Sequence, residues 1–136
     1  MYDVPATPLL LAPRVRRVTP IARARILMID DGSDVGVGLL LLFRIWGHAV
    51  SVAHTWRHGV LQACSQDPQL VLVNLDLPGI GPLETVLGAL KPDLRGHRVV
   101  ALKEGLAYFV EEGELGPQLT LAKTTTLKSI VKSMVD

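Results

Sequence analysis

Short runs of apolar residues alternate with longer amphipathic stretches from Arg25 to the end of the chain. The runs are rich in Val, Ile and Leu, as is typical of strands that are covered on both faces of a parallel sheet. The stretches between them have the length and the apolar spacing of helices. The pattern predicts an open, doubly wound α/β sheet in which strands and helices alternate. The expected strands are Arg25 to Asp30, Ala49 to Ala53, Leu70 to Val73, Arg98 to Leu102 and Leu119 to Ala122.

Capping residues at the ends of the amphipathic stretches support this division. Ser33 is a good N-cap for the first helix, and Gly47 follows that helix where a left-handed residue is favoured. The second helix is expected to bury Val60, Leu61 and Cys64. The expected helices are Val35 to Trp46, Thr55 to Ser65, Leu83 to Leu90, Glu104 to Glu112 and Thr126 to Val135.

Composition limits the classes of protein to which the chain can belong. Of its 136 residues, 49% are apolar, which excludes an intrinsically disordered chain. A single cysteine excludes a disulfide scaffold and favours a reducing, cytoplasmic setting. The longest apolar stretch, Val35 to Phe43, is shorter than the roughly 18 residues that cross a bilayer, so no membrane association is expected.

The first 24 residues differ from the rest of the chain. They contain four of the nine prolines and show neither helical nor strand periodicity. We therefore expect a flexible, basic tail over residues 1–24 and one domain over residues 25–136. Five arginines lie within the first 25 residues, but without interleaved aromatic residues they do not favour nucleic-acid binding.

Polar side chains follow the predicted strands at their carboxyl ends, where ligands bind in sheets of this type. Two adjacent carboxylates repel each other, and a divalent cation or a lysine between them relieves the repulsion. The residues therefore predict a polar site at this edge of the sheet. Its candidate residues are Asp30 and Asp31 after the first strand, Asn74 and Asp76 after the third, Lys103 after the fourth and Lys123 after the fifth.

These segments resemble the receiver domains of bacterial two-component response regulators. Residues 25–31, RILMIDD, are similar to the family's first strand and acidic pair, and residues 67–79, DPQLVLVNLDLPG, to its third strand and the following loop. The resemblance implies a flavodoxin-like fold with five parallel strands in the order 2-1-3-4-5. It also implies that Asp30 and Asp31 hold Mg²⁺, that the residue four before Pro78 accepts a phosphoryl group, and that Lys123 contacts this group.

The chain departs from the family at the positions that serve phosphorylation. The acceptor position is Asn74, and a carboxamide cannot form an acyl phosphate. Lys103 replaces the family's Thr or Ser at the end of the fourth strand, and Thr120 replaces its aromatic switch residue. We interpret the chain as a degenerate pseudo-receiver that is not an enzyme. Any Mg²⁺ site at Asp30 and Asp31 is expected to be weakened, and no other cofactor is expected.

Three alternatives stay open from the residues alone. Asp76 could accept the phosphoryl group if the third strand were shifted by two residues, since such a shift keeps the same face. The ammonium group of Lys103 could neutralise the acidic pair, or it could point to solvent. Gly32, Gly36 and Gly38 have the spacing of a dinucleotide-binding loop of an oxidoreductase, but the neighbouring acidic pair would repel a pyrophosphate.

Two surfaces are candidates for binding other proteins. The first predicted helix is apolar nearly all round, so Val37 and Leu41 are expected on a surface that a partner or a second copy covers. Tyr108 and Phe109 are aromatic anchors for the surface that receiver-like domains use more often. The resemblance implies a histidine kinase, another signalling domain or an output domain as the partner, with a homodimer as the alternative.

Overall fold

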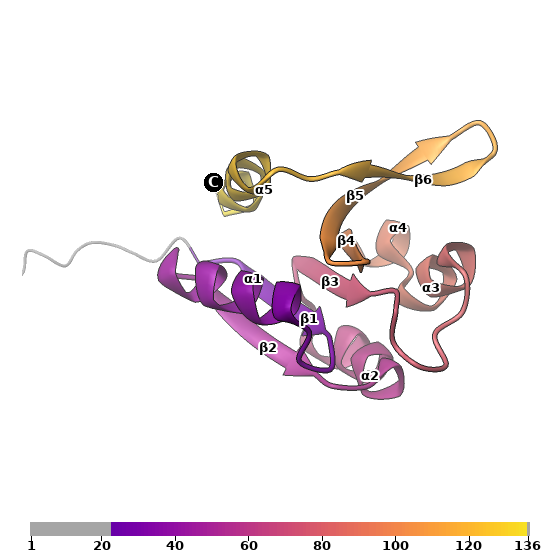
Figure 1. The fold of residues 1–136 in the computed structure, drawn as a ribbon, viewed down its shortest axis with the longest axis horizontal. Coiled ribbons are helices and arrows are strands. Elements are labelled where there is room, and N and C mark those ends of the chain that lie inside the picture. Colours follow the sequence, from indigo (N-terminus) through magenta and orange to yellow (C-terminus); the bar gives the residue numbers. More distant parts are fainter. Residues whose placement is uncertain (1–22, 136) are drawn as a thin grey trace, which may run out of the picture.

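The computed structural model describes residues 23–135, so the expected tail lies outside the described residues except for its last two positions. The described residues form a six-stranded sheet in the order β2-β1-β3-β4-β5-β6 (Figure 1). No helix within this range is long and apolar enough to cross a bilayer. The strands are β1 (Arg25–Ile29), β2 (Ala49–Ala53), β3 (Leu70–Asn74), β4 (Arg98–Lys103), β5 (Leu106–Gly113) and β6 (Gly116–Leu121). The helices are α1 (Asp34–Ile45), α2 (Trp56–Gln66), α3 (Leu83–Leu90), α4 (Pro92–Arg95) and α5 (Thr124–Ser133).

The first four strands are parallel and form the expected flavodoxin-like α/β core. Their order, β2-β1-β3-β4, is also the expected one. Every residue of β3 is buried, because this strand lies between β1 and β4 and both of its faces are covered. The uninterrupted apolar run at residues 70–73 is the sequence signature of that position.

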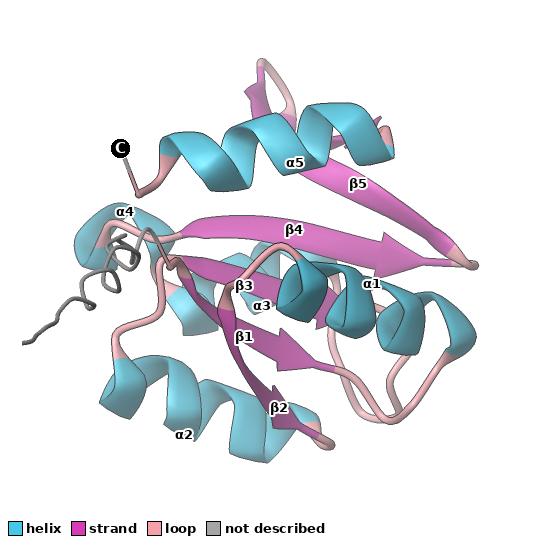
Figure 2. Cartoon of the chain, turned by 90° about the vertical axis from the view of Figure 1, so that its left-hand side faces the viewer, coloured by secondary structure: helices cyan, strands magenta, loops and turns pink. Residues whose placement is uncertain are grey.

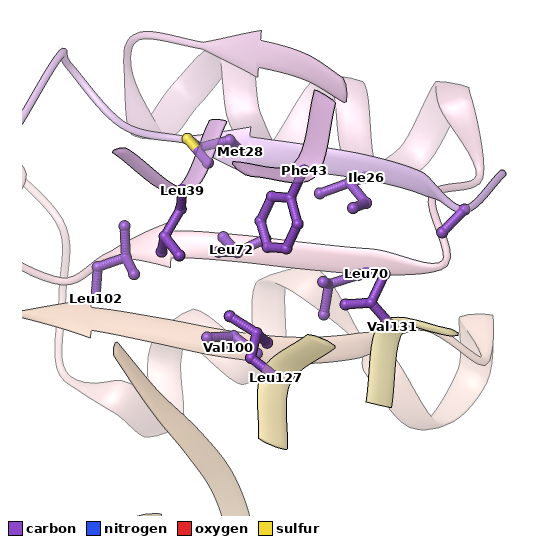
Figure 3. Packing of buried hydrophobic residues seen from close by; sticks show 11 residues of the cluster. Ile26, Met28, Leu39, Phe43, Leu70, Leu72, Val100, Leu102, Leu127 and Val131 are labelled. Atoms are coloured by element: carbon purple, nitrogen blue, oxygen red, sulfur yellow. The ribbon is translucent and has the colours of Figure 1, made fainter. Parts of the chain in front are cut away.

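Helices cover the two faces of this parallel part (Figures 1 and 2). On one face, Phe43 of α1 and Leu127 of α5 pack against apolar side chains of β1, β3 and β4 (Figure 3). On the other face, Ala63 of α2 and Val86 of α3 pack against the alternate residues of the same strands. Side chains alternate between the faces along a strand, so one apolar run supplies both clusters.

The C-terminal part of the sheet corrects the prediction of a helix over Glu104 to Glu112. Strand β5 lies there instead, antiparallel to β4, and β6 is antiparallel to β5. The sheet therefore has six strands and is mixed, where five parallel strands were expected. Glu104 and Gly105 have φ angles of 50° and 79°. Two successive positive φ angles belong to the tight type I′ turn, which leads the chain straight back along its neighbour.

Helix α2 buries different residues from those expected. Its buried residues are Gly59 and Ala63, whereas Leu61 is 60% exposed and Cys64 is also exposed. A Cβ atom at Gly59 would overlap the side chain of Ile29. The helix therefore packs closely on β1 through its small residues and turns larger ones toward solvent.

Helix α1 presents an apolar stripe to solvent. Val37, Leu41 and Ile45 follow one another at intervals of one helical turn and are 44%, 54% and 77% exposed. The same helix buries Leu39 and Phe43 against the sheet. No other part of residues 23–135 buries the stripe.

Candidate functional site

The carboxyl ends of β1, β3 and β4 meet at one edge of the sheet, where two predicted site residues are buried. Asp30 follows β1 and is 2% exposed, and Asn74 ends β3 and is 7% exposed. The backbone N–H of Asp30 donates to the carbonyl of Ala53 at 2.9 Å, and that of Leu75 to the carbonyl of Leu102 at 2.8 Å. Hydrogen bonds of the sheet thus continue up to both side chains and position them at this edge.

The carboxylate of Asp30 accepts four hydrogen bonds from within the protein. Its Oδ1 accepts from the hydroxyl of Ser33 at 2.7 Å and from Nδ2 of Asn74 at 2.8 Å. Its Oδ2 accepts from the backbone N–H groups of Gly32 at 3.0 Å and Ser33 at 2.9 Å. A carboxylate offers about four lone-pair sites, so those of Asp30 are filled. The charge also lies at the N-terminus of α1, where the helix dipole favours an anion.

The amide of Asn74 joins two acidic residues. While Nδ2 donates to Asp30, Oδ1 accepts from the backbone N–H of Asp76 at 2.8 Å. The carboxylate of Asp76 in turn accepts from the backbone N–H of Glu104 at 2.8 Å. The orientation of the amide is thereby fixed, because only its oxygen can accept from an N–H group and only its nitrogen can donate to a carboxylate.

Two small residues at the N-terminus of α1, Ser33 and Gly36, complete the site. Neither was predicted from the sequence as a residue of this site. Ser33 was expected only to cap α1, and it does accept from the N–H of Gly36 at 3.2 Å. A Cβ atom at Gly36 would overlap the carboxylate of Asp30. The close approach of α1 to Asp30 therefore requires glycine at this position. The signal in the sequence was a cap residue, Ser33, and a glycine, Gly36, within six residues of Asp30.

The cationic candidates lie apart from Asp30. Lys103 and Lys123 are exposed, as is Asp31, and neither lysine forms an ion pair with a carboxylate within residues 23–135. Lys123 follows β6, and both β4 and β5 lie between that strand and β3. Three strand spacings amount to about 14 Å, which exceeds the reach of a lysine side chain. The insertion of β5 therefore moves Lys123 away from Asn74.

The remaining predicted residues lie on the antiparallel strands. Tyr108 and Phe109 are half-buried in β5 and, as neighbours on a strand, point to opposite faces of the sheet. Phe109 packs against the cluster beneath α5. They therefore do not form one aromatic surface, since β5 replaces the helix in which they were expected. Thr120 is exposed on β6, and its hydroxyl donates to Oε1 of Glu111 at 3.0 Å.

The site in this arrangement does not fit Mg²⁺. The lone pairs of Asp30 are occupied, and Asn74 directs an N–H donor, not an oxygen, toward the carboxylate. Mg²⁺ requires oxygen ligands in octahedral geometry. Asp31 is the acidic neighbour that stays exposed, and residues 23–135 contain no group of three metal-ligating side chains. Within residues 23–135, hydrogen bonds and the N-terminus of α1 stabilise the charge of Asp30.

A buried histidine joins the start of β1 to the turn after α1. Nδ1 of the buried His48 accepts from the backbone N–H of Ala24 at 3.1 Å. Burial lowers the pKa of His48, and the nearby charge of Arg23 lowers it further. The histidine must be neutral at Nδ1 to accept this bond.

Comparisons with known proteins agree with this architecture. No family model matches the chain, and no curated protein matches it. Among solved structures, it is similar to the receiver domain of the hybrid histidine kinase CckA, with a TM-score of 0.56, 19% identity, and coverage of 82% of this chain and 99% of that one. The chain has the receiver fold.

Two further solved structures extend the comparison. An anti-anti-sigma factor PhyR mutant from Bartonella quintana aligns with the receiver fold of this chain at a TM-score of 0.59 and 17% identity, over 83% of this chain and 48% of that one. The receiver domain of a LuxO repressor protein from Vibrio parahaemolyticus aligns at 0.51 and 20% identity, over 60% and 62%. The chain thus spans less than two thirds of the length of that domain.

Proposed function

We propose that this chain is a receiver-fold signalling module that acts through protein–protein contacts and whose state is not set by aspartyl phosphorylation. The observation that carries the proposal is the hydrogen bond from Asn74 Nδ2 to Asp30 Oδ1. It places an amide donor where a receiver needs a nucleophilic carboxylate, and an amide does not form an acyl phosphate.

Electrostatics supports the same proposal. A phosphoryl group at the end of β3 would bring two negative charges beside the buried carboxylate of Asp30. Cations would have to offset this repulsion, and the two candidate lysines are exposed and unpaired with Asp30. Hydrogen bonds already stabilise the carboxylate of Asp30, and within the described range neither lysine is paired with it to stabilise an added phosphoryl group.

The geometry of the α1 N-terminus also argues against a dinucleotide-binding oxidoreductase. A pyrophosphate binds to free N–H groups at a helix N-terminus. Here the N–H groups of Gly32 and Ser33 donate to Asp30. This supports a signalling module over a dinucleotide-binding oxidoreductase.

The apolar stripe of α1 is the surface on which we place the partner. Val37, Leu41 and Ile45 form it, and exposed apolar groups at this spacing are typical of helices that pack against another protein. The partner is a histidine kinase, another signalling domain or an output domain, and a second copy is the alternative. The free, exposed Cys64 is in keeping with a cytoplasmic setting.

Phosphotransfer gives the direct test. We would incubate the protein with Mg²⁺ and acetyl phosphate and measure its intact mass at once. The expected result is an unmodified mass. A phosphoryl adduct that hydroxylamine removes would overturn the proposal, and its loss in Asp76→Asn would identify Asp76 as the acceptor, whose carboxylate is exposed.

The variant Asn74→Asp tests the hydrogen bond that carries the proposal. It removes the donor to Asp30 and brings two carboxylates together, so we expect the free energy of unfolding to fall by about 2 kcal/mol without Mg²⁺. Millimolar Mg²⁺ should restore part of this loss, as measured by urea denaturation. The control Asn74→Ala should also lose stability but should not respond to Mg²⁺. If Asn74→Asp were as stable as the wild type in EDTA, the hydrogen bond would not have the proposed importance.

A further inference from the structure

Strands β4 and β5 separate part-way along their length. They pair from Lys103 and Leu106 at the turn as far as Val100 and Phe109. Beyond that point β5 continues to pair only with β6, as far as Gly113 (Figures 1 and 2). A cleft of about 430 Å³ opens between the diverging strands, with α4 at one side and α5 at the other.

The cleft combines an apolar floor with an acidic rim. Among its apolar residues are Val99 of β4 and Val110 of β5. Three acidic residues line it, Asp93, Glu111 and Glu112, whereas Arg98 is the one Lys or Arg among the described lining residues. Such a surface is complementary to a segment that is both apolar and basic.

A buried histidine in the cleft lacks a hydrogen-bonding partner. His97 is 5% exposed and lines the cleft, and its Nε2 has no partner within residues 23–135. Burial is the main cause that lowers the pKa of His97, and Arg95 adds to it, while Asp67 acts in the opposite direction. An unpaired buried polar atom is unfavourable, and a segment that enters the cleft could supply its partner.

The backbone of the diverging strands is also unpaired toward the cleft. Beyond the pair of Val100 and Phe109, no backbone hydrogen bond joins β4 to β5 within the described range. The N–H and C=O groups of residues 110–113 that point away from β6 therefore lack a strand partner. An extended segment can bind to such an edge through main-chain hydrogen bonds.

We infer that the cleft binds residues 9–18 of this chain as an extended segment. Their sequence, LLLAPRVRRV, joins an apolar part to Arg14, Arg16 and Arg17, which match the apolar floor and the three acidic residues of the rim. This inference goes beyond the proposed function and does not depend on it.

The described chain begins at the same end of the sheet as the cleft, two strand spacings from β4. The side-chain oxygen of Gln69 accepts from the backbone N–H of Arg25 at 2.9 Å, and its carbonyl accepts from the N–H of Arg98 at 3.0 Å. Gln69 therefore joins the start of β1 to a residue that lines the cleft. The five steps along the chain from residue 18 to residue 23 can span about 17 Å when extended, which exceeds the roughly 10 Å across the two strand spacings from β1 to β4.

Hydrogen exchange of the full chain tests this inference. In the wild type, we expect those amides of residues 110–113 that point away from β6 to be protected. In the variant R14E/R16E/R17E, these amides should exchange at least tenfold faster. The control R44E/R57E/K132E makes the same change of charge at exposed positions on three helices and should leave the exchange unaltered. Adding E111K/E112K to the first variant restores the opposite charges and should restore protection.

The outcomes of this experiment distinguish residues 9–18 from a second copy of the chain as the occupant of the cleft. The amides of α2 serve as a reference for overall stability and should exchange equally slowly in the wild type and in R14E/R16E/R17E. If they do, equal exchange of residues 110–113 in the two proteins would overturn the inference. Protection that disappears on dilution would also overturn it, because the occupant would then be a second copy. Protection that is independent of concentration and is lost only in the arginine variant is the expected result.

Discussion

The parallel part of the sheet, β1 to β4, and its C-terminal hairpin, β5 and β6, differ in how completely they are covered. All residues of β3 are buried, whereas no residue of β5 or β6 is fully buried. A parallel connection must cross over the sheet, and each crossover adds a helix that covers a face. A tight turn adds no helix, so the two strands that it introduces stay half-exposed. The connection between strands therefore decides how much of each strand is buried.

The same difference explains the state of the candidate site. Asp30 and Asn74 belong to the parallel part and remain together, as expected from their strand ends. Lys123 belongs to the segment that follows the hairpin, and the additional strand moves it outward. The strand order in one region thus separates Lys123 from the site in the other region where it was expected.

The largest difference between the two regions should come from truncating a core residue in each. Leu72→Ala in β3 removes a side chain with 0% exposure and should lower the free energy of unfolding by about 3 kcal/mol. Leu119→Ala in β6 removes a half-buried side chain and should cost about 1 kcal/mol or less. Urea denaturation measures both. Equal losses would show that the hairpin is packed as tightly as β3.

Two glycines of α1 give a sharper contrast within the parallel part. Gly36→Ala would place a methyl group against the Asp30 carboxylate and should lower stability by about 2 kcal/mol. At Gly38, a Cβ atom meets nothing within 4 Å. Gly38→Ala should therefore raise stability by about 1 kcal/mol through helix propensity alone. Thermal denaturation of the two variants should show shifts of opposite sign, and shifts of the same sign would refute the close contact at Gly36.

The turn between β4 and β5 should respond to backbone conformation. Gly105→Ala places a side chain at a φ of 79° and should lower stability by about 1 kcal/mol. Glu104→Asn should raise it slightly, since Asn tolerates the left-handed conformation that Glu104 adopts with a φ of 50°. Hydrogen exchange in β5 reports the effect locally. An effect that spreads equally to β3 would mean that the two regions open as one unit.

Acidification should produce the smallest effect. Burial lowers the pKa of both His48 and His97 in the folded protein, so the unfolded chain binds more protons at mildly acidic pH. Stability is therefore complete above the ordinary histidine pKa of about 6.5 and decreases as the pH falls below it. The melting temperature should be lower at pH 5.5 than at pH 7.5. His48→Gln should reduce this difference.

The parallel part could be predicted from the sequence because burial on both faces leaves a plain apolar run, as at residues 70–73. The hairpin could not be recognised by that rule. Residues 106–110, LAYFV, are apolar without alternation, and such short runs are compatible with either a helix or a strand. The glycines at 105, 113 and 116 were the better signal, because they bound two strand-length segments.

For the candidate site, the residue types were predictable but their contacts were not. The spacing of Asp30 and Asn74 at strand ends placed them at one edge of the sheet. The spacing alone does not specify how closely the start of α1 approaches Asp30. It therefore does not predict that the hydroxyl of Ser33 and the backbone N–H groups of Gly32 and Ser33 fill the carboxylate. The position of Lys123 depended on the strand count, so one misassigned element displaced a site residue.

The two-residue turn between β4 and β5 has a consequence for the order in which the sheet assembles. Lys103 and Leu106 pair across this turn, whereas Ile26 must find Leu70 far along the chain. Closing a short loop costs less chain entropy than closing a long one. The β4–β5 pair can therefore form early, while the pairing of the parallel strands limits the speed at which the whole domain folds.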